Sequence, residues 1–169
     1  KEQGLVLLLS GQENITLAAL ERTPFWGLVN WSKLKATAAE IARQLQFRGR
    51  IEAPANTNSG GNQQKLVIGK WVATGADVLI FDEPTRGIDI GAKVEVYRLV
   101  HALAARGAAI ILVSAELTEL MNVAHRIIVM SKGVVQDELQ LEEFSERRIL
   151  TAAFAGHIGR PAATMHPEP

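Results

Sequence analysis

Short apolar runs that end at polar residues are the clearest pattern in the sequence. Residues 78–81 are apolar and lead directly into Asp82 and Glu83, and residues 109–113 lead into Ser114. Runs this short are typical of strands, and strands that are apolar on both faces are typical of a parallel sheet covered on both sides. We therefore predict an α/β chain in which two fully buried parallel strands end at polar side chains.

Helical periodicity separates and follows these strands. It predicts a first helix that Ser32 caps and Gly49 ends, and glycine with a preceding cation at Arg106 and Gly107 predicts the end of another. A turn at residues 131–133 predicts a β-hairpin. The predicted helices cover residues 32–47, 61–74, 91–105, 116–123 and 141–155, and the hairpin strands cover 126–130 and 133–138.

Length and composition change this picture in three ways. The chain has 169 residues, 47% of them hydrophobic, which favours one globular core. Basic and acidic residues both number 18, so no net charge favours a nucleic-acid partner. Cysteine is absent, which excludes disulfides and thiolate metal sites, and the apolar stretches are too short for a membrane span. Because the first residue is Lys1 instead of Met, we expect the chain to start inside a larger protein.

The two acids at the end of residues 78–81 are candidates for chemistry. Asp82 could hold Mg²⁺ through its water shell, and Glu83 could take a proton from an attacking water. Pro84 cannot donate to a neighbouring strand and Gly87 permits a sharp turn, so the strand should stop where the acids begin. The alternative is that both acids are solvated loop residues.

A second candidate lies upstream, where Ser59, Gly60 and Gly61 open a predicted helix. A helix N-terminus carries partial positive charge and free N–H groups, and glycine lets a phosphate approach. The sequence therefore predicts an anion site here. Serine-glycine pairs also make ordinary turns and helix caps, so the pattern alone leaves both interpretations open.

Together the two segments resemble motifs of ATP-binding-cassette (ABC) ATPases. Residues 58–65, Asn-Ser-Gly-Gly-Asn-Gln-Gln-Lys, are similar to the ABC signature in the form typical of monosaccharide importers, and residues 78–89 resemble the Walker B strand and D-loop. They lie about twenty residues apart with Walker B second, which is more specific than either motif alone. The resemblance implies an α/β, P-loop NTPase-like ABC domain with a small α-helical subdomain.

The resemblance also implies an organisation of the chain. Residues 1–20 would be a remnant of the core after the Q-loop, 21–75 the α-helical signature subdomain, 76–155 the RecA-like core, and 156–169 a loose tail. Nothing matches the Walker A pattern Gly-x-x-x-x-Gly-Lys-Ser/Thr, so the N-terminal part of the core is expected to be missing. The chain resembles the second, C-terminal nucleotide-binding domain of a tandem sugar importer.

Residue roles follow from the same resemblance. Glu83 would be the catalytic residue that polarises the attacking water, and Asp82 would hold Mg²⁺ through water. Asp89 would organise the D-loop across the interface between two ABC domains and would be one of the nucleotide-binding residues. The residues expected to contact the ATP held by the partner domain are Ser59, Gly60, Gly61, Asn62 and Gln63.

The function implied is ATP hydrolysis that energises import of a monosaccharide or related polyol. ATP and Mg²⁺ would be the cofactors. The partners would be another ABC domain, membrane permease subunits and, indirectly, a periplasmic sugar-binding protein, with no nucleic acid. The location would be peripheral, on the cytoplasmic face of the inner membrane, and the fragment alone should be inactive.

Two positions depart from the ABC pattern and keep an alternative open. Ala115 stands where most relatives have a switch histidine, and Asn58 replaces a leucine before the signature serine. Alanine can neither bind a γ-phosphate nor transfer a proton. The alternative is therefore a degenerate ABC domain that serves as a docking or regulatory half.

Phe25, Trp26 and Trp31 form the one aromatic cluster of the sequence. Clustered aromatic residues usually pack in a core, and this is the first interpretation. The second is a contact with a permease subunit, because the resemblance places the helical subdomain there.

Overall fold

The structure is a computed structural model that describes residues 4–22, 24–25 and 28–156, with only the backbone described at residues 21, 22, 24, 25 and 28. The chain divides into two compact units, Lys1–Val113 and Ser114–Pro169. This division falls inside the predicted segment 76–155. The four predicted segments stay a prediction, and most of the predicted tail lies outside the described residues.

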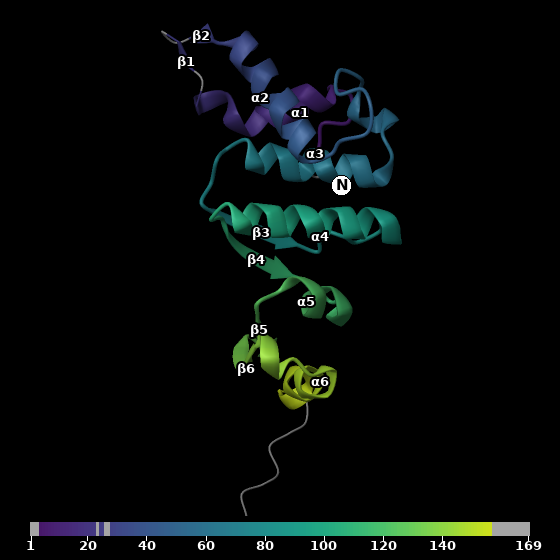
Figure 1. Cartoon of the computed structure of the whole chain (residues 1–169), viewed down its shortest axis with the longest axis vertical. Coiled ribbons are helices and arrows are strands. Elements are labelled where there is room, and N and C mark those ends of the chain that lie inside the picture. Colours follow the sequence, from purple (N-terminus) through teal and green to yellow (C-terminus); the bar gives the residue numbers. More distant parts are fainter. Residues whose placement is uncertain (1–3, 23, 26–27, 157–169) are drawn as a thin grey trace, which may run out of the picture. The chain divides into compact units, whose positions relative to one another are not determined.

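The first part of unit 1 is mainly helical (Figure 1). Helix α1 contacts both α2 and α3. Ile15, Leu34 and Leu66 are almost fully buried and supply the apolar core of this helical layer. Its elements are α1 (Gly11–Thr16), η1 (Leu17–Arg22), β1 (Pro24–Phe25), β2 (Leu28–Val29), α2 (Trp31–Gln44), η2 (Ala55–Thr57) and α3 (Gly60–Val72).

Helix α1 begins at a capping box. The Ser10 hydroxyl accepts a hydrogen bond from the Glu13 amide, and the Glu13 carboxylate accepts one from the Ser10 amide. The Asn14 side chain is fully buried, donates to the carbonyls of Val6, Leu9 and Ser10, and accepts from the Val6 amide. These bonds satisfy a buried amide and fix the segment that precedes the helix.

Helix α2 differs from its predicted bounds at both ends. Its cap is Asn30 instead of Ser32, because the Asn30 side chain accepts from the Lys33 amide. The helix ends at Gln44 instead of near Phe47, because Gln46 has a left-handed φ of 48° that a helix cannot continue through. The predicted cap was therefore wrong by two residues and the predicted end by about three.

A two-stranded parallel sheet forms the second part of unit 1. Strand β3 (Val78–Asp82) pairs in register with β4 (Ala109–Val113), and helix α4 (Ile90–Ala105) connects them. Both strands and the connecting helix were predicted. Gly107 has a φ of 96°, which confirms the predicted helix end.

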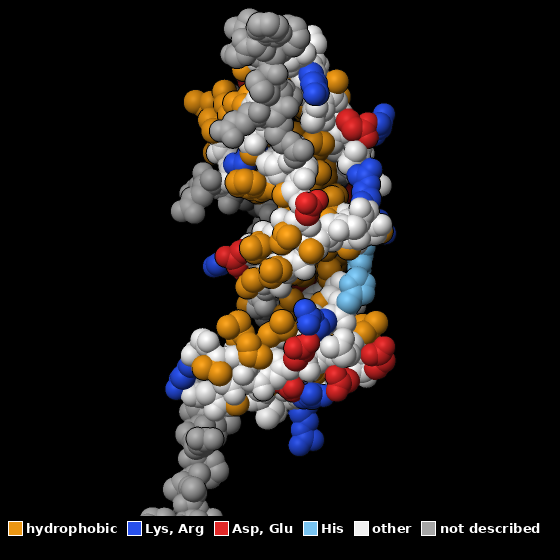
Figure 2. Space-filling view, turned by 90° about the vertical axis from the view of Figure 1, so that its left-hand side faces the viewer, with side chains coloured by type: hydrophobic (Ala, Val, Ile, Leu, Met, Phe, Trp, Pro, Cys, Tyr) orange, Lys and Arg blue, Asp and Glu red, His pale blue; other side chains and the backbone are white. Residues whose placement is uncertain are grey.

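The prediction that both strands are fully buried was wrong. Leu79 and Phe81 are buried, but Ile80 is 67% exposed and Ile111 is 51% exposed. Apolar side chains also gather at other places on the surface (Figure 2). The strands carry the two-faced apolar pattern of a covered parallel sheet, yet in this chain only one face of the sheet is covered.

Unit 2 is built on an antiparallel hairpin. Lys132 and Gly133 at the turn have positive φ values of 48° and 77°, as a tight two-residue hairpin turn requires. Ile127, Leu139 and Ile149 belong to the buried cluster of this unit. Its elements are α5 (Leu117–Val123), β5 (Arg126–Ser131), β6 (Val134–Gln140), η3 (Leu141–Glu143) and α6 (Glu146–Ala155).

The helix predicted over 141–155 is broken in the structure. The Glu143 carboxylate accepts from the Gln140 amide, which closes a short turn at residues 141–143. Ser145 then has an extended φ of −144°, so a new helix begins at Glu146. Local hydrogen bonding overrides the helical periodicity here.

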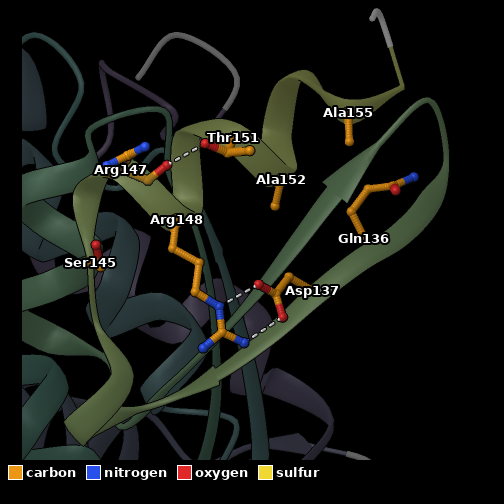
Figure 3. A pocket seen from close by; sticks show the side chains of 8 residues that line it. All are labelled: Gln136, Asp137, Ser145, Arg147, Arg148, Thr151, Ala152 and Ala155. Atoms are coloured by element: carbon orange, nitrogen blue, oxygen red, sulfur yellow. Dashed lines mark hydrogen bonds and ion pairs between the residues drawn. The ribbon is translucent and has the colours of Figure 1, made fainter. Parts of the chain in front are cut away.

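An ion-pair cluster fastens α6 to the hairpin, and it predicts acid sensitivity. The Arg148 guanidinium binds Asp137 through two hydrogen bonds of 2.7 and 2.8 Å and lowers the pKa of that carboxyl (Figure 3). A carboxyl with a lowered pKa stabilises the fold above its unfolded pKa, and this contribution is lost as the pH falls through the folded value. Hydrogen-exchange protection at β6 and α6, measured relative to the unfolded chain at the same pH, should therefore fall below about pH 4, and fall less in Arg148→Gln. An equal fall in protection in both proteins would contradict this role.

Candidate functional site

The two predicted acids at the end of strand β3 lie in different environments. Asp82 is exposed and shares the open face of the strand with Val78 and Ile80, because side chains alternate along a strand. Glu83 is half-buried and has a φ of 48°, unusual for a residue that is not glycine. Its amide donates to the Val113 carbonyl at 2.9 Å, which holds this conformation. Backbone strain of this kind is concentrated at functional sites.

The chain turns sharply after the acids, as predicted. Pro84 and Thr85 are buried, and Gly87 adopts a φ of 69° that favours glycine. The turn leads to Asp89, whose carboxylate accepts from the Ala92 amide at 2.9 Å and caps helix α4. In this structure Asp89 therefore fixes the start of the helix that follows the acidic turn.

The cap at Asp89 makes a testable contribution to stability. Asp89→Ala should lower the free energy of unfolding by about 1 kcal/mol, because an amide at the start of α4 loses its acceptor. Asp89→Asn should cost much less, since the asparagine oxygen can also accept. Urea unfolding followed by tryptophan fluorescence measures both. Equal losses in the two variants would show that the charge, not the cap, carries the effect.

The predicted anion site lies at the start of α3. Ser59 is the N-cap, and its hydroxyl accepts from the Asn62 amide at 3.4 Å. The amides of Gly60 and Gly61 donate to no atom of the described residues. Two unengaged N–H groups at the positive end of a 13-residue helix fit a phosphate group.

The side chains of the next two predicted residues are held by the protein itself. The Asn62 amide group donates to the Arg48 carbonyl, and its oxygen accepts from the Arg48 amide at 3.3 Å. The Gln63 side chain donates to the Asn58 carbonyl at 3.0 Å. Contact of these side chains with a nucleotide stays a prediction. Asn58 itself is half-buried and joined to the helix start by this bond.

Gly61 is required by a close approach between helices. A Cβ atom added at Gly61 would lie 2.7 Å from the Cβ of Ala92 on α4. This is shorter than real Cβ contacts, so α3 and α4 approach each other here only because residue 61 has no side chain. The signature segment is thereby packed directly on the first turn of the helix that Asp89 caps.

Among the predicted residues, Asp82 alone would hold magnesium, through a bound water. Within the described residues, no three acidic or histidine side chains gather in a way that could hold a metal ion. An exposed carboxylate such as Asp82 fits Mg²⁺ that keeps several waters and is otherwise bound by phosphate oxygens.

A cavity of about 430 Å³ lies in unit 2, between strand β6 and helix α6 (Figure 3). It contains none of the residues that the sequence proposed for the site. Two basic side chains, Arg147 and Arg148, line the cavity. Of these, Arg148 forms ion pairs with Asp137 and Glu143. The lining residues are Gln136, Asp137, Ser145, Arg147, Arg148, Thr151, Ala152 and Ala155.

Sequence reasoning missed a charged cluster beside the signature. Lys65 is only 3% exposed, and its ammonium nitrogen lies 2.7 Å from the Glu95 carboxylate on α4. Arg48 lies 3.5 Å from the same carboxylate group. The sequence pattern that could have indicated a buried Lys65 is its spacing: it lies four residues from Gly61 and four from Gly69, on one face of the helix.

The aromatic cluster is only partly described. Trp26 and the side chain of Phe25 lie outside the described part of the chain. Trp31 is 62% exposed at the start of α2, so its side chain does not belong to the core. For Trp31 the core interpretation is wrong, and a partner contact stays a prediction.

The chain is clearly similar in sequence to known proteins. The family model described as ABC transporter matches residues 2–86. The chain belongs to the ABC transporter family. This match contains both the signature at residues 58–65 and the strand that ends at Asp82 and Glu83. The predicted fold class, an α/β ABC domain, is confirmed.

Curated relatives of this ABC chain are sugar import proteins by name. The ribose import ATP-binding protein RbsA 2 of Escherichia coli O157:H7 is 42% identical over 154 residues, which cover 90% of this chain and 30% of that protein. RbsA 2 of Streptomyces coelicolor is 44% identical over 94% of this chain and 31% of its own length. The xylose import ATP-binding protein XylG of Geobacillus kaustophilus is 41% identical over 92% and 31%. The chain thus spans less than a third of these relatives.

Solved structures agree on the fold. An ATP-binding cassette in a dimeric post-hydrolysis state, bound to ADP and Pi, has a TM-score of 0.68 and 23% identity, covering 83% of this chain and 60% of that one. The ADP conformation of another cassette has a TM-score of 0.71 and 20% identity, covering 92% and 65%. In the part of the ABC chain described here, no helix has the length and apolar character to span a membrane.

Proposed function

We propose that this chain is the C-terminal ABC domain segment of an ATPase that energises import of a monosaccharide or related polyol. The observation that carries the proposal is the pair of acids at the end of β3, with Glu83 held in a left-handed conformation beside β4. Identity of 41 to 44% to ribose and xylose import ATP-binding proteins supports the sugar class. These relatives are named as ATP-binding import proteins. Their names give no support to the alternative of a degenerate ABC domain that serves only as a docking or regulatory half.

Each proposed residue has a defined task. The exposed Asp82 would hold Mg²⁺ through water, and the magnesium would neutralise charge on the phosphates. Glu83 would accept the proton of the attacking water. The amides of Gly60 and Gly61, with the Ser59 hydroxyl, would bind the phosphates of ATP held by a second ABC domain.

The proposed partners follow from this arrangement. The signature would face the phosphate-binding loop of another ABC domain, and the ATP site that contains the acidic turn would be closed by the signature of that other domain. The helical layer of unit 1, including the exposed Trp31, would transmit closure of these sites to permease subunits at the cytoplasmic face of the membrane. A periplasmic sugar-binding protein would supply the substrate to the permease.

A segment exchange tests the proposal. The matching 154 residues of the Escherichia coli relative are replaced by the corresponding part of this chain, giving what we call the exchange protein. We expect it to hydrolyse Mg-ATP at a rate close to that of the unaltered relative, because the signature and both acids are present. An exchange protein that folds and binds ATP but hydrolyses none would contradict the proposed function.

A further inference from the structure

Lys65 is the most deeply buried cation among the residues described, with a side chain 3% exposed. Removing an ammonium group from water is costly unless partners replace the solvent. Here the Glu95 carboxylate lies 2.7 Å away, and the Gln46 carbonyl accepts a hydrogen bond of 2.9 Å. The buried ammonium group of Lys65 therefore has specific polar partners within the helix packing.

Glu95 connects two functional segments. It lies on α4, six residues after the Asp89 cap, while Lys65 lies on α3, six residues after the Ser59 cap. The hydrogen bond from Lys65 is the main cause of the lowered pKa of Glu95, which keeps the carboxylate charged. A charged, short contact of this kind joins the helix of the signature to the helix of the acidic turn.

Three further contacts surround the same junction. Arg48 approaches Glu95 with its guanidinium at 3.5 Å and is bound through its backbone to the Asn62 side chain. Gly61 lets α3 pack on Ala92 without a side chain between them. The Lys65–Glu95 ion pair therefore joins α3 to α4 directly, Arg48 links Asn62 on α3 to Glu95 on α4, and the glycine contact packs the first turns of the two helices on each other.

We propose that Lys65 and Glu95 are a positioning pair that makes the signature and the start of α4 move as one body. Neither side chain is assigned to touch the nucleotide. Their task is to keep the phosphate-binding amides at Gly60 and Gly61 in a fixed place relative to Asp89. This inference rests on the proposed function for its role in ATP hydrolysis, but the linkage itself is a property of this chain.

Hydrogen exchange in this chain tests the linkage without ATP. The amides of Asn62 and Gln63 are hydrogen-bonded at the start of α3, and those of Ala92 and Lys93 at the start of α4. Glu95→Gln on α4 should accelerate exchange at Asn62 and Gln63 by about tenfold, and Lys65→Met on α3 should do the same at Ala92 and Lys93.

Controls separate this linkage from a general loss of stability. Lys65→Arg should keep the exchange rates of the unaltered chain, because arginine can also bind Glu95. Glu142→Gln, at an exposed glutamate of unit 2, should leave all four amides unchanged. The double variant at Lys65 and Glu95 should be no worse than either single variant. Acceleration that is uniform over unit 1, or confined to the substituted helix, would overturn the inference.

The exchange protein tests the consequence for ATP. Lys65→Met should lower kcat/KM for Mg-ATP by about tenfold, chiefly through KM, and Lys65→Arg should restore it. Suppose that the exchange protein hydrolyses ATP and that its Lys65→Met variant keeps the same kcat and the same KM. This result would overturn the positioning role. A different result would contradict the proposed function but not the linkage: faster hydrogen exchange on the helix opposite each substitution, together with an exchange protein that hydrolyses no ATP.

Discussion

Glu83→Gln is expected to slow Mg-ATP hydrolysis by the exchange protein by about 10²- to 10⁴-fold, the usual effect of losing a general base. Glutamine has nearly the same size and keeps the backbone bond to Val113, so only the proton acceptor is removed. ATP binding should be unchanged for the same reason. Steady-state phosphate release and fluorescent ATP binding measure the two effects.

The control for Glu83 is an exposed glutamate of the same unit. Glu52→Gln removes the same charge from the surface and should leave the hydrolysis rate as it is. If Glu83→Gln hydrolyses ATP as fast as the unaltered exchange protein, Glu83 is not the general base, and the domain would then act only as a docking or regulatory half.

Leu66→Ala is expected to lower the free energy of unfolding of unit 1 by about 2 to 5 kcal/mol. Leu66 is fully buried in α3, and its side chain closes the gap beside Gly11 of α1, where an added Cβ would meet it at 3.0 Å. Truncation would leave a cavity between the two helices that the tight packing cannot close. Urea unfolding followed by tryptophan fluorescence reports the change, since Trp71 lies on α3.

The matched control for Leu66 is another leucine of unit 1. Leu8 is 81% exposed, so Leu8→Ala should change the free energy of unfolding by no more than about 0.5 kcal/mol. A similar small loss in Leu66→Ala would mean that α1 and α3 do not share a packed core.

Much of the fold could be predicted because its signals are local. The apolar runs at β3 and β4 have the length of strands, and Gly107 and Gly133 stand where positive φ values end a helix and close a hairpin. The errors also have local causes. Asn30 competes with Ser32 as a cap, and Glu143 folds back to Gln140 and breaks the last helix.

Other features depend on tertiary packing and gave weaker signals. The exposure of Ile80 could not be predicted, because an apolar strand pattern does not tell which of its faces is covered in this chain. The burial of Lys65 gave only a weak signal, since lysine is seldom buried and its partner Glu95 lies 30 residues further along the chain. The left-handed conformation of Glu83 likewise depends on its bond to β4.

ATP-dependent ribose uptake tests the central claim most directly. The exchange protein is expressed in cells whose own ribose import ATPase has been deleted, next to its Glu83→Gln variant. We predict that the exchange protein restores uptake and that the variant does not, because import requires hydrolysis at the site containing Glu83. Equal uptake with both proteins, or none with an exchange protein that assembles with its permease, would contradict the claim.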